Sequence, residues 1–420
     1  MRHPVSRLIV IGLTLAGLAA VADAQDWTRF RGPNGTGAAT GGDGIPVKFG
    51  PADYNWTAEL PGIGHSSPVV WGDKIFLLSA DPDNATRYMI CIRAADGKAA
   101  WIRQFESEPH HLHLRSSFAS CTPAVDAERV YVAWSTPTKT TFMALDHAGE
   151  TVWEVDLGTW QSQHGFGTSP IVYEDTVILF NSQQANQLKE GEKPGESFMM
   201  AFDRRTGEER WRRERVSVNV CYSVPCIYEG PQGDELICCS TGDGVFSLNP
   251  KTGEENWKLP DAFSMRTVAS PVVAGGNILG STGSGGGGNY IIAVKPGKKP
   301  EEVFRIKTAA NYVPTPVVYD DMIFSWYDKG IVTCIDAKTG DVHWRERLGA
   351  AFSGSPIRVD DRMYCINEDG VVYCVACSKE FKLLGESELG EPSRSTPAVS
   401  GGRMYLRTYS HLISVGGKSS

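Results

Sequence analysis

The feature that most constrains this chain is a tandem repeat. A small residue, a proline and two or three apolar residues recur eight times, with the prolines at Pro68, Pro123, Pro170, Pro225, Pro271, Pro316, Pro356 and Pro397. From the first to the last proline is 329 residues over seven intervals, a mean period of 47. A unit of this length cannot enclose its own apolar core, so its neighbours must cover it.

Each unit has the pattern of four short β-strands. A strand after the proline is followed by a turn such as Trp71-Gly72-Asp73-Lys74 and by an apolar strand at 75–78. The third strand ends in a small residue, an apolar residue and Asp, as in Cys334-Ile335-Asp336, and a glycine turn then leads to Trp344. Four strands joined by Gly- and Asp-containing turns are typical of one propeller blade.

A tryptophan recurs in the outer strand of these units. It occupies Trp101, Trp153, Trp211, Trp257 and Trp344, while Phe304 replaces it in the fifth unit and only Leu384 lies nearby in the seventh. We expect the ring to wedge between adjacent blades and to bury about 150 to 250 Å².

The eighth unit stops before its outer strand. The missing strand is predicted at the other end of the chain, at 55–60, which contains Trp56 and precedes the first proline motif. Pairing of the two ends would leave no exposed sheet edge. The sequence therefore predicts an all-β fold, a single eight-bladed β-propeller of four-stranded antiparallel blades over 55–417, closed by an N-terminal strand and followed by a tail at 418–420.

Residues 1–24 have the pattern of an export signal. Arg2 and Arg7 precede an apolar stretch, and Ala22-Asp23-Ala24 is an A-x-A cleavage site before Gln25. The stretch is too short for a membrane span, no later run is apolar enough for one, and the first cysteine is Cys91. We expect a periplasmic or secreted protein with no transmembrane segment and no lipid anchor, and a leader segment at 25–54 to which the sequence assigns no role.

The charge balance argues against one class of partner. Lys and Arg number 41 against 49 Asp and Glu, a net charge of −8, and no sustained basic run occurs. Nucleic acid is therefore not expected as a partner.

Residues 57–417 resemble the PQQ-like, or tryptophan-docking, β-propeller family, and the match to its blade consensus is best at 201–211. The segment 27–35 is similar to the leader of exported bacterial members. The resemblance implies one of two functions. One is a non-catalytic binding or scaffold module similar to the BamB subunits of the β-barrel assembly machinery. The other is a PQQ- and calcium-dependent dehydrogenase of alcohols or sugars, with an Asp as base.

Ten cysteines in an exported protein could form disulfides. Cys91, Cys334 and Cys374 instead align with Ala or Ser of other units, and Cys238 and Cys365 share a second-strand position. We predict that these five are small buried residues with free thiols. The pair Cys238-Cys239 is similar to the vicinal disulfide of quinoprotein alcohol dehydrogenases, although neighbours on a strand face opposite sides.

Two further clusters admit two interpretations each. His110, His111 and His113 could include a pair of metal ligands, or could belong to an exposed loop. The run Gly283–Gly288 could bind phosphate, but no helix follows it, and a flexible hairpin is the interpretation we adopt.

The most informative positions lie three to six residues before each blade proline, in loops that in this family lead toward the central channel. They hold His65, Phe118, His164, Phe166, Tyr222, Arg266, Asn311, Tyr312, Phe352 and Arg394. Flat and cationic groups around a polar funnel suit an anionic or planar ligand. The alternative is that these side chains pack one loop on the next.

The sequence-based hypothesis is thus a binding module for an extracytoplasmic protein, peptide or small ligand at one propeller face. It requires no cofactor, whereas the dehydrogenase alternative requires PQQ and calcium.

Overall fold

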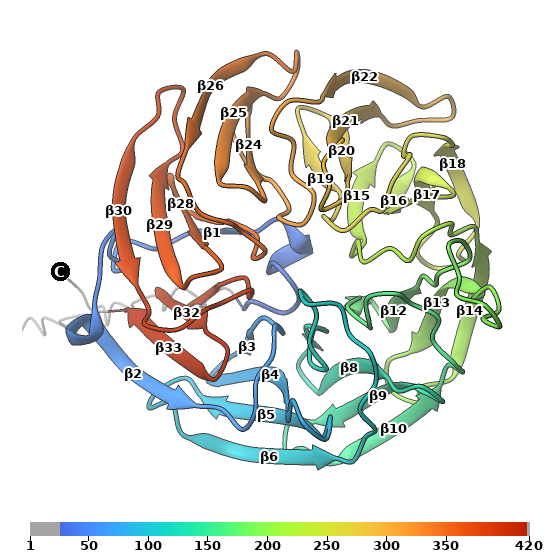
Figure 1. The fold of residues 1–420 in the computed structure, drawn as a ribbon, viewed down its shortest axis with the longest axis horizontal. Coiled ribbons are helices and arrows are strands. Elements are labelled where there is room, and N and C mark those ends of the chain that lie inside the picture. Colours follow the sequence, from blue (N-terminus) through green and yellow to red (C-terminus); the bar gives the residue numbers. More distant parts are fainter. Residues whose placement is uncertain (1–25, 418–420) are drawn as a thin grey trace, which may run out of the picture.

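The computed structural model describes residues 26–417, which form eight antiparallel blades around a central channel (Figure 1). The predicted all-β, eight-bladed propeller is confirmed. The predicted signal at 1–24, residue Gln25 and the tail at 418–420 lie outside the described residues. No helix within 26–417 is long and apolar enough to cross a membrane.

The blades follow one another in chain order. Blade 1 contains β3 (Val69–Trp71), β4 (Lys74–Ala80), β5 (Arg87–Arg93) and β6 (Ala99–Phe105); blade 2 contains β7 (Ala124–Val125), β8 (Arg129–Ser135), β9 (Thr140–Asp146) and β10 (Thr151–Asp156). Blade 3 contains β11 (Ile171–Tyr173), β12 (Thr176–Asn181), β13 (Ser197–Asp203) and β14 (Glu209–Arg215); blade 4 contains β15 (Cys226–Gly230), β16 (Gly233–Ser240), β17 (Gly244–Leu248) and β18 (Glu255–Leu259). Blade 5 contains β19 (Val272–Ala274), β20 (Asn277–Thr282), β21 (Tyr290–Lys295) and β22 (Glu301–Ile306); blade 6 contains β23 (Val317–Tyr319), β24 (Met322–Tyr327), β25 (Ile331–Asp336) and β26 (Val342–Arg347). Blade 7 contains β27 (Ile357–Val359), β28 (Arg362–Ile366), β29 (Val371–Ala376) and β30 (Leu383–Glu388); blade 8 contains β31 (Ala398–Ser400), β32 (Arg403–Arg407), β33 (His411–Gly416) and β2 (Tyr54–Glu59).

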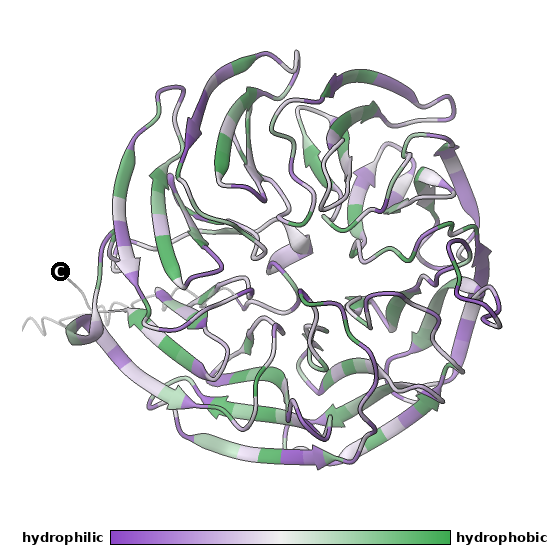
Figure 2. Cartoon of the chain, in the orientation of Figure 1, coloured by the Kyte–Doolittle hydropathy of each residue, from purple (hydrophilic) through white to green (hydrophobic). Residues whose placement is uncertain are grey.

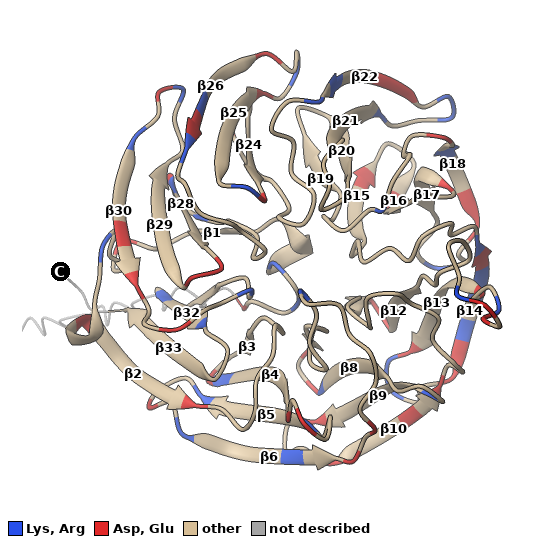
Figure 3. Cartoon of the chain, in the orientation of Figure 1, with Lys and Arg blue, Asp and Glu red and all other residues tan. Residues whose placement is uncertain are grey.

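The N-terminal strand closes the ring as predicted. Strand β2 pairs antiparallel with β33, with Trp56 opposite Ser414. The second and third strands of each blade are almost wholly buried and apolar, while the outer strands carry most of the charge, as on β14, β18 and β26 (Figures 2 and 3). Each blade thus buries its middle strands between two neighbours and exposes one edge to solvent.

The recurrent tryptophan docks on the next blade. The Trp153 indole lies against Gly207 and donates its Nε1–H to the Arg204 carbonyl at 3.1 Å. A β-carbon at Gly207 would stand 2.7 Å from the indole ring, so only glycine fits. The same contact joins Trp56 to Gly97, Trp101 to Gly149, Trp211 to Gly253 and Phe304 to Gly340. The predicted wedge is confirmed at these junctions, whereas Trp257 donates to Glu235 of its own blade.

The leader crosses the face of the propeller at which the innermost strand of each blade ends (Figure 1). We call this the far face. Trp27 is fully buried and exchanges two backbone hydrogen bonds with Val70 of blade 1. Asn34, in the short 3₁₀ helix η1 (Pro33–Gly35), pairs with the Ile227 backbone of blade 4. Strand β1 (Ala38–Ala39) then adds to β27 in parallel, and a second 3₁₀ turn, η2 (Pro51–Asp53), leads into β2.

Two leader arginines enter the channel. Arg29 donates to the Pro225 carbonyl, and Arg31 donates to the Pro316 carbonyl at 2.8 Å and lies 3.5 Å from that of Pro356. Burial lowers the pKa of Arg29 to about 10 and that of Arg31 to about 9. Both remain cationic at neutral pH, and their hydrogen bonds tie blades 4, 6 and 7 to the leader.

All ten cysteines are free and buried, so the prediction of small buried thiols is confirmed. Cys238 packs into the apolar cluster that includes Phe180, while Cys239 packs into the one that includes Phe263. The two side chains therefore face opposite sides of β16, and both are buried.

The docking contact predicts that two glycine substitutions reduce the free energy of unfolding by different amounts. Gly207→Ala and Gly158→Ala both place a β-carbon at positive φ, +75° and +83°, but only Gly207 meets an indole ring. We expect Gly207→Ala to reduce the free energy of unfolding by about 1 to 3 kcal/mol more than Gly158→Ala, because the core must shift. Urea denaturation of both variants measures the difference, and equal losses would contradict the docking role.

Candidate ligand-binding site

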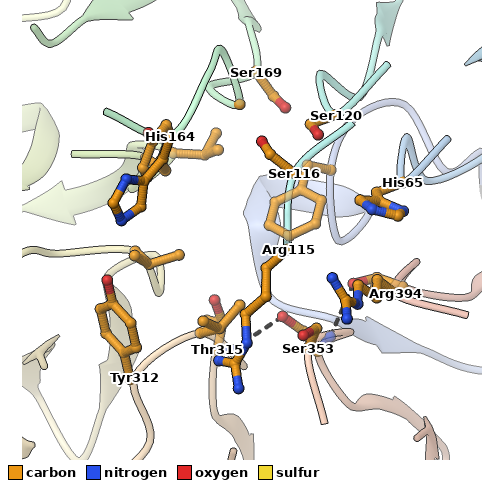
Figure 4. A pocket seen from close by; sticks show the side chains of 18 of the residues that line it. His65, Arg115, Ser116, Ser120, His164, Ser169, Tyr312, Thr315, Ser353 and Arg394 are labelled. Carbon is orange, nitrogen blue, oxygen red and sulfur yellow. Dashed lines mark hydrogen bonds between the residues drawn. The ribbon is translucent and has the colours of Figure 1, made fainter. Parts of the chain in front are cut away.

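A cavity of about 480 Å³ opens at the mouth of the channel, opposite the leader. Loops of all eight blades contribute lining residues, among them His65, His164, Tyr312 and Arg394 (Figure 4). Phe30 of the leader also lines the cavity. We call this cavity the cup. Its lining is His65, Ser67, His113, Arg115, Ser116, Ser120, Thr122, His164, Gly167, Ser169, Tyr222, Val224, Arg266, Val268, Ser284, Gly285, Tyr312, Val313, Thr315, Ser353, Ser355, Arg394, Thr396 and Phe30.

The floor of the cup is a ring of hydroxyl groups from the residues that precede the blade prolines. Each hydroxyl oxygen accepts the backbone N–H of its counterpart in the preceding blade, at 2.9 to 3.1 Å. The hydroxyls belong to Ser67, Thr122, Ser169, Ser270, Thr315, Ser355 and Thr396. Val224 has no hydroxyl, so the ring lacks a bond between blades 3 and 4. Because each oxygen already accepts, its own proton remains available for donation.

Three arginines give the cup its charge. Arg394 lies 3.1 Å from the Glu368 carboxylate, and Arg115 lies 3.8 Å from that of Asp328. Arg266 donates from Nε to the Val220 carbonyl at 2.8 Å, and its Nη1 lies 3.0 Å from His164 Nε2. Arg266 makes no ion pair within the described residues.

The histidines of the cup are neutral. Burial lowers the pKa of His65 to about 3, with Arg394 and Arg407 adding repulsion. Burial and Arg266 lower the pKa of His164 to about 4. His113, whose pKa is lowered by burial and then by Arg115, Arg266 and Arg394, stacks on His164 with ring centroids 4.5 Å apart. The positive charge at neutral pH therefore resides on guanidinium groups.

One loop, between β6 and β7, extends over the cup. The Leu114 carbonyl accepts a hydrogen bond from Arg394 of blade 8 at 2.7 Å. Arg115 extends across the cavity (Figure 4), and its Nη1 lies 3.8 Å from the Asp328 carboxylate of blade 6. The Leu114 side chain is 92% exposed. The loop thus spans the mouth and presents one apolar side chain to solvent.

Comparison with known proteins identifies the family to which this chain belongs. Residues 114–325 and 304–380 match the family described as "Outer membrane protein assembly factor BamB". The chain belongs to this BamB family. A search of curated proteins returned no significant match.

Solved structures share the family fold at low sequence identity. BamB from Moraxella catarrhalis is 13% identical with a TM-score of 0.63, covering 86% of this chain and 98% of that one. Quinohemoprotein alcohol dehydrogenase from Comamonas testosteroni is 13% identical with a TM-score of 0.65, covering 94% and 81%. The computationally designed Ika8 protein is 11% identical with a TM-score of 0.56, covering 86% and 98%. At these identities, likeness to BamB and to an alcohol dehydrogenase establishes the fold alone.

The structure brings six of the ten predicted mouth residues together in the cup: His65, His164, Tyr222, Arg266, Tyr312 and Arg394.

The prediction is corrected at the other four positions, Phe118, Phe166, Asn311 and Phe352, which do not line the cup. Phe352 is fully buried against Trp326 and Tyr373, and Phe166 packs edge-on to Trp160. Asn311 is also fully buried and donates to Ser281 and to the Pro314 carbonyl. Phe118 packs on His110 and Arg87. These four side chains stabilise loops, which was the alternative interpretation.

Several cup residues escaped sequence analysis. Arg115 lies eight residues before Pro123, outside the window used, because its loop is longer than the others. His113 was interpreted as part of a metal-ligand pair or of an exposed loop, whereas it lines the cup and stacks on His164. The glycine run contributes Ser284 and Gly285 to the wall of the cup.

The residues of the cup do not fit calcium. That ion takes six to eight oxygen ligands, several of them carboxylates. Asp328 already accepts the backbone N–H groups of Tyr312 and Val313, and Glu368 accepts from Ser353 and Arg394. No group of three His, Cys, Asp or Glu residues within 26–417 is placed to hold a metal ion.

The hydroxyl ring under the cup predicts a stability effect. Thr122→Val keeps the shape of the side chain but leaves the Ser67 N–H without its acceptor, and we expect a loss of about 1 to 3 kcal/mol in the free energy of unfolding. Val224→Thr supplies an oxygen at the one step that lacks it and should cost less than Thr122→Val. Thermal and urea denaturation of the pair tests this, and a reversed order would refute the ring as a stabilising element.

Proposed function

We propose that this protein is an extracytoplasmic, non-catalytic binding module that takes a small ligand or a segment of a partner protein into the cup. The export pattern of residues 1–24 supports the location. Membership of the BamB family supports a protein-binding role without specifying the partner.

The observation that carries the proposal is that the channel is blind. The leader fills its far end with Trp27, Arg29 and Arg31, while the mouth remains open above Phe30. A concave site lined by a few convergent polar groups on a rigid scaffold is typical of ligand binding. A structural channel would need neither the opening nor three cationic side chains directed around it.

Occupancy of the cup can be tested without knowing the natural ligand. We expect small neutral ¹⁹F-labelled aromatic fragments to bind the wild-type chain, detected by line broadening in ¹⁹F NMR. Ser284→Trp places a bulky ring at the cup wall and should abolish this binding, whereas Lys298→Trp, an exposed residue of the same blade, should not. Equal binding by both variants would contradict a binding role for the cup.

The rival function is the dehydrogenase. The fold is compatible with it, but the donor set does not fit calcium, and the Cys238-Cys239 pair is buried within β16 rather than at the mouth.

Reconstitution tests this rival function. We expect that PQQ and Ca²⁺ added to the purified protein will give neither stoichiometric binding by calorimetry nor reduction of an artificial electron acceptor with alcohols or sugars. A known quinoprotein serves as the positive control. Stoichiometric PQQ binding with turnover would replace the binding-module proposal by the enzyme.

A further inference from the structure

We propose that the cup binds a carboxylate group, as the end of a peptide chain or of a small organic acid, with Arg266 as its charge partner. The inference rests on the proposed binding function of the same site and adds the chemical class of the ligand.

Arg266 is the cationic group of the cup without an opposite charge. Arg394 and Arg115 each face a carboxylate, at 3.1 and 3.8 Å. Within residues 26–417, the hydrogen bonds of Arg266 go to neutral groups: the Val220 carbonyl, His164 Nε2 and, at 3.4 Å, Gln184 Oε1. A partly buried guanidinium held only by dipoles gains more from an anionic ligand than one that is already paired.

Gln184 fixes the direction of Arg266. This side chain is fully buried, accepts the Val220 N–H at 3.0 Å, and donates to the Asn186 carbonyl at 2.7 Å and to Asn219 Oδ1 at 2.9 Å. With all of its polar atoms engaged, Gln184 cannot swing away. It is a positioning residue that holds the guanidinium in place before a ligand arrives.

The remaining polar side chains that line the cup are hydroxyl groups and histidines, without a carboxylate among the described residues. The hydroxyl protons of the floor ring are free to donate, and the two carboxylates near the mouth are already bonded to backbone N–H groups or to Ser353 and Arg394. A cationic ligand would find no carboxylate among the lining residues of the cup within 26–417, whereas an oxygen-rich anion would find hydroxyl donors and Arg266.

The charge and the shape of the cup narrow the chemical class of its ligand further. One unpaired guanidinium balances one negative charge, which favours a carboxylate over a dianionic phosphate. The cup is blind, so it admits the end of a chain and not a continuous segment. The exposed Leu114 above the cup could then contact the body of the ligand.

The test uses the full-length mature protein with ¹³C-labelled histidine rings. The probes are N-acetyltriglycine, its C-terminal amide, butanoate and inorganic phosphate at millimolar concentrations. We expect the two carboxylic acids to shift the His164 resonance and to raise the pKa of His164, because a bound anion offsets the repulsion from Arg266. The amide and phosphate should produce no such shift.

Two matched variants test whether Arg266 is the group that binds the carboxylate. Arg266→Gln should weaken binding of the acids at least about tenfold, since hydrogen bonds to a charged group are the strong ones. Arg103→Gln removes an arginine of the outer strand β6, which pairs with Glu150, and should leave binding unchanged. Circular dichroism and melting temperature confirm that both variants are folded.

The outcomes separate the alternatives. Tenfold tighter binding of N-acetyltriglycine than of butanoate identifies a peptide end, and equal binding identifies a small acid. Binding of the amide as strong as that of the acid, preference for phosphate, absence of acid binding, or undiminished binding by Arg266→Gln would each overturn the carboxylate proposal. Neutral fragments that still bind the cup would leave the general binding function intact.

Discussion

The hydrogen bonds between hydroxyl groups and backbone N–H groups at the start of the inner strands are the constraint on which the rest of the structure depends. They account for the Ser or Thr directly before the proline in seven of the eight blades and link each of these blades to the preceding one. Seven of the eight steps have this bond, and Val224 interrupts it once. Since the ring is narrow, the loops above it converge, and their side chains define the cup.

The same repeated geometry explains which features of the fold could be predicted from the sequence. Blade number, strand order, closure by 55–60 and docking of Trp153 follow from a repeat, because every copy shows the same pattern in the same place. The residues that line the cup could be predicted from the sequence only in part. A fixed distance before each proline identifies the loop but not the direction of the side chain, so Phe352 packs inward while Arg394 faces the channel. Leader residues such as Arg31 have no repeated counterpart, and their burial could not be predicted from one sequence.

The charged side chains in the channel of the propeller differ from those on its outer surface. The chain is acidic overall, and its outer strands carry both signs in exposed pairs that contribute little stability. The channel is instead occupied by arginines: Arg29 and Arg31 at the far end, and Arg115, Arg266 and Arg394 at the mouth. Those at the far end are buried and donate to blade carbonyls, whereas Arg266 lines the open cup and makes no ion pair among the described residues. This contrast separates structural cations from one that is available to a ligand.

The leader and β2 also impose an order on folding. Both lie at the start of the chain, yet β1 pairs with β27 and β2 pairs with β33, near its end. The first thirty residues of the described chain therefore cannot complete their contacts until blades 7 and 8 have formed. Closure joins residues with the largest sequence separation in the molecule, which makes it a slow step. Until then the blades have two open sheet edges, and the chain depends on its own last strand to end that exposure.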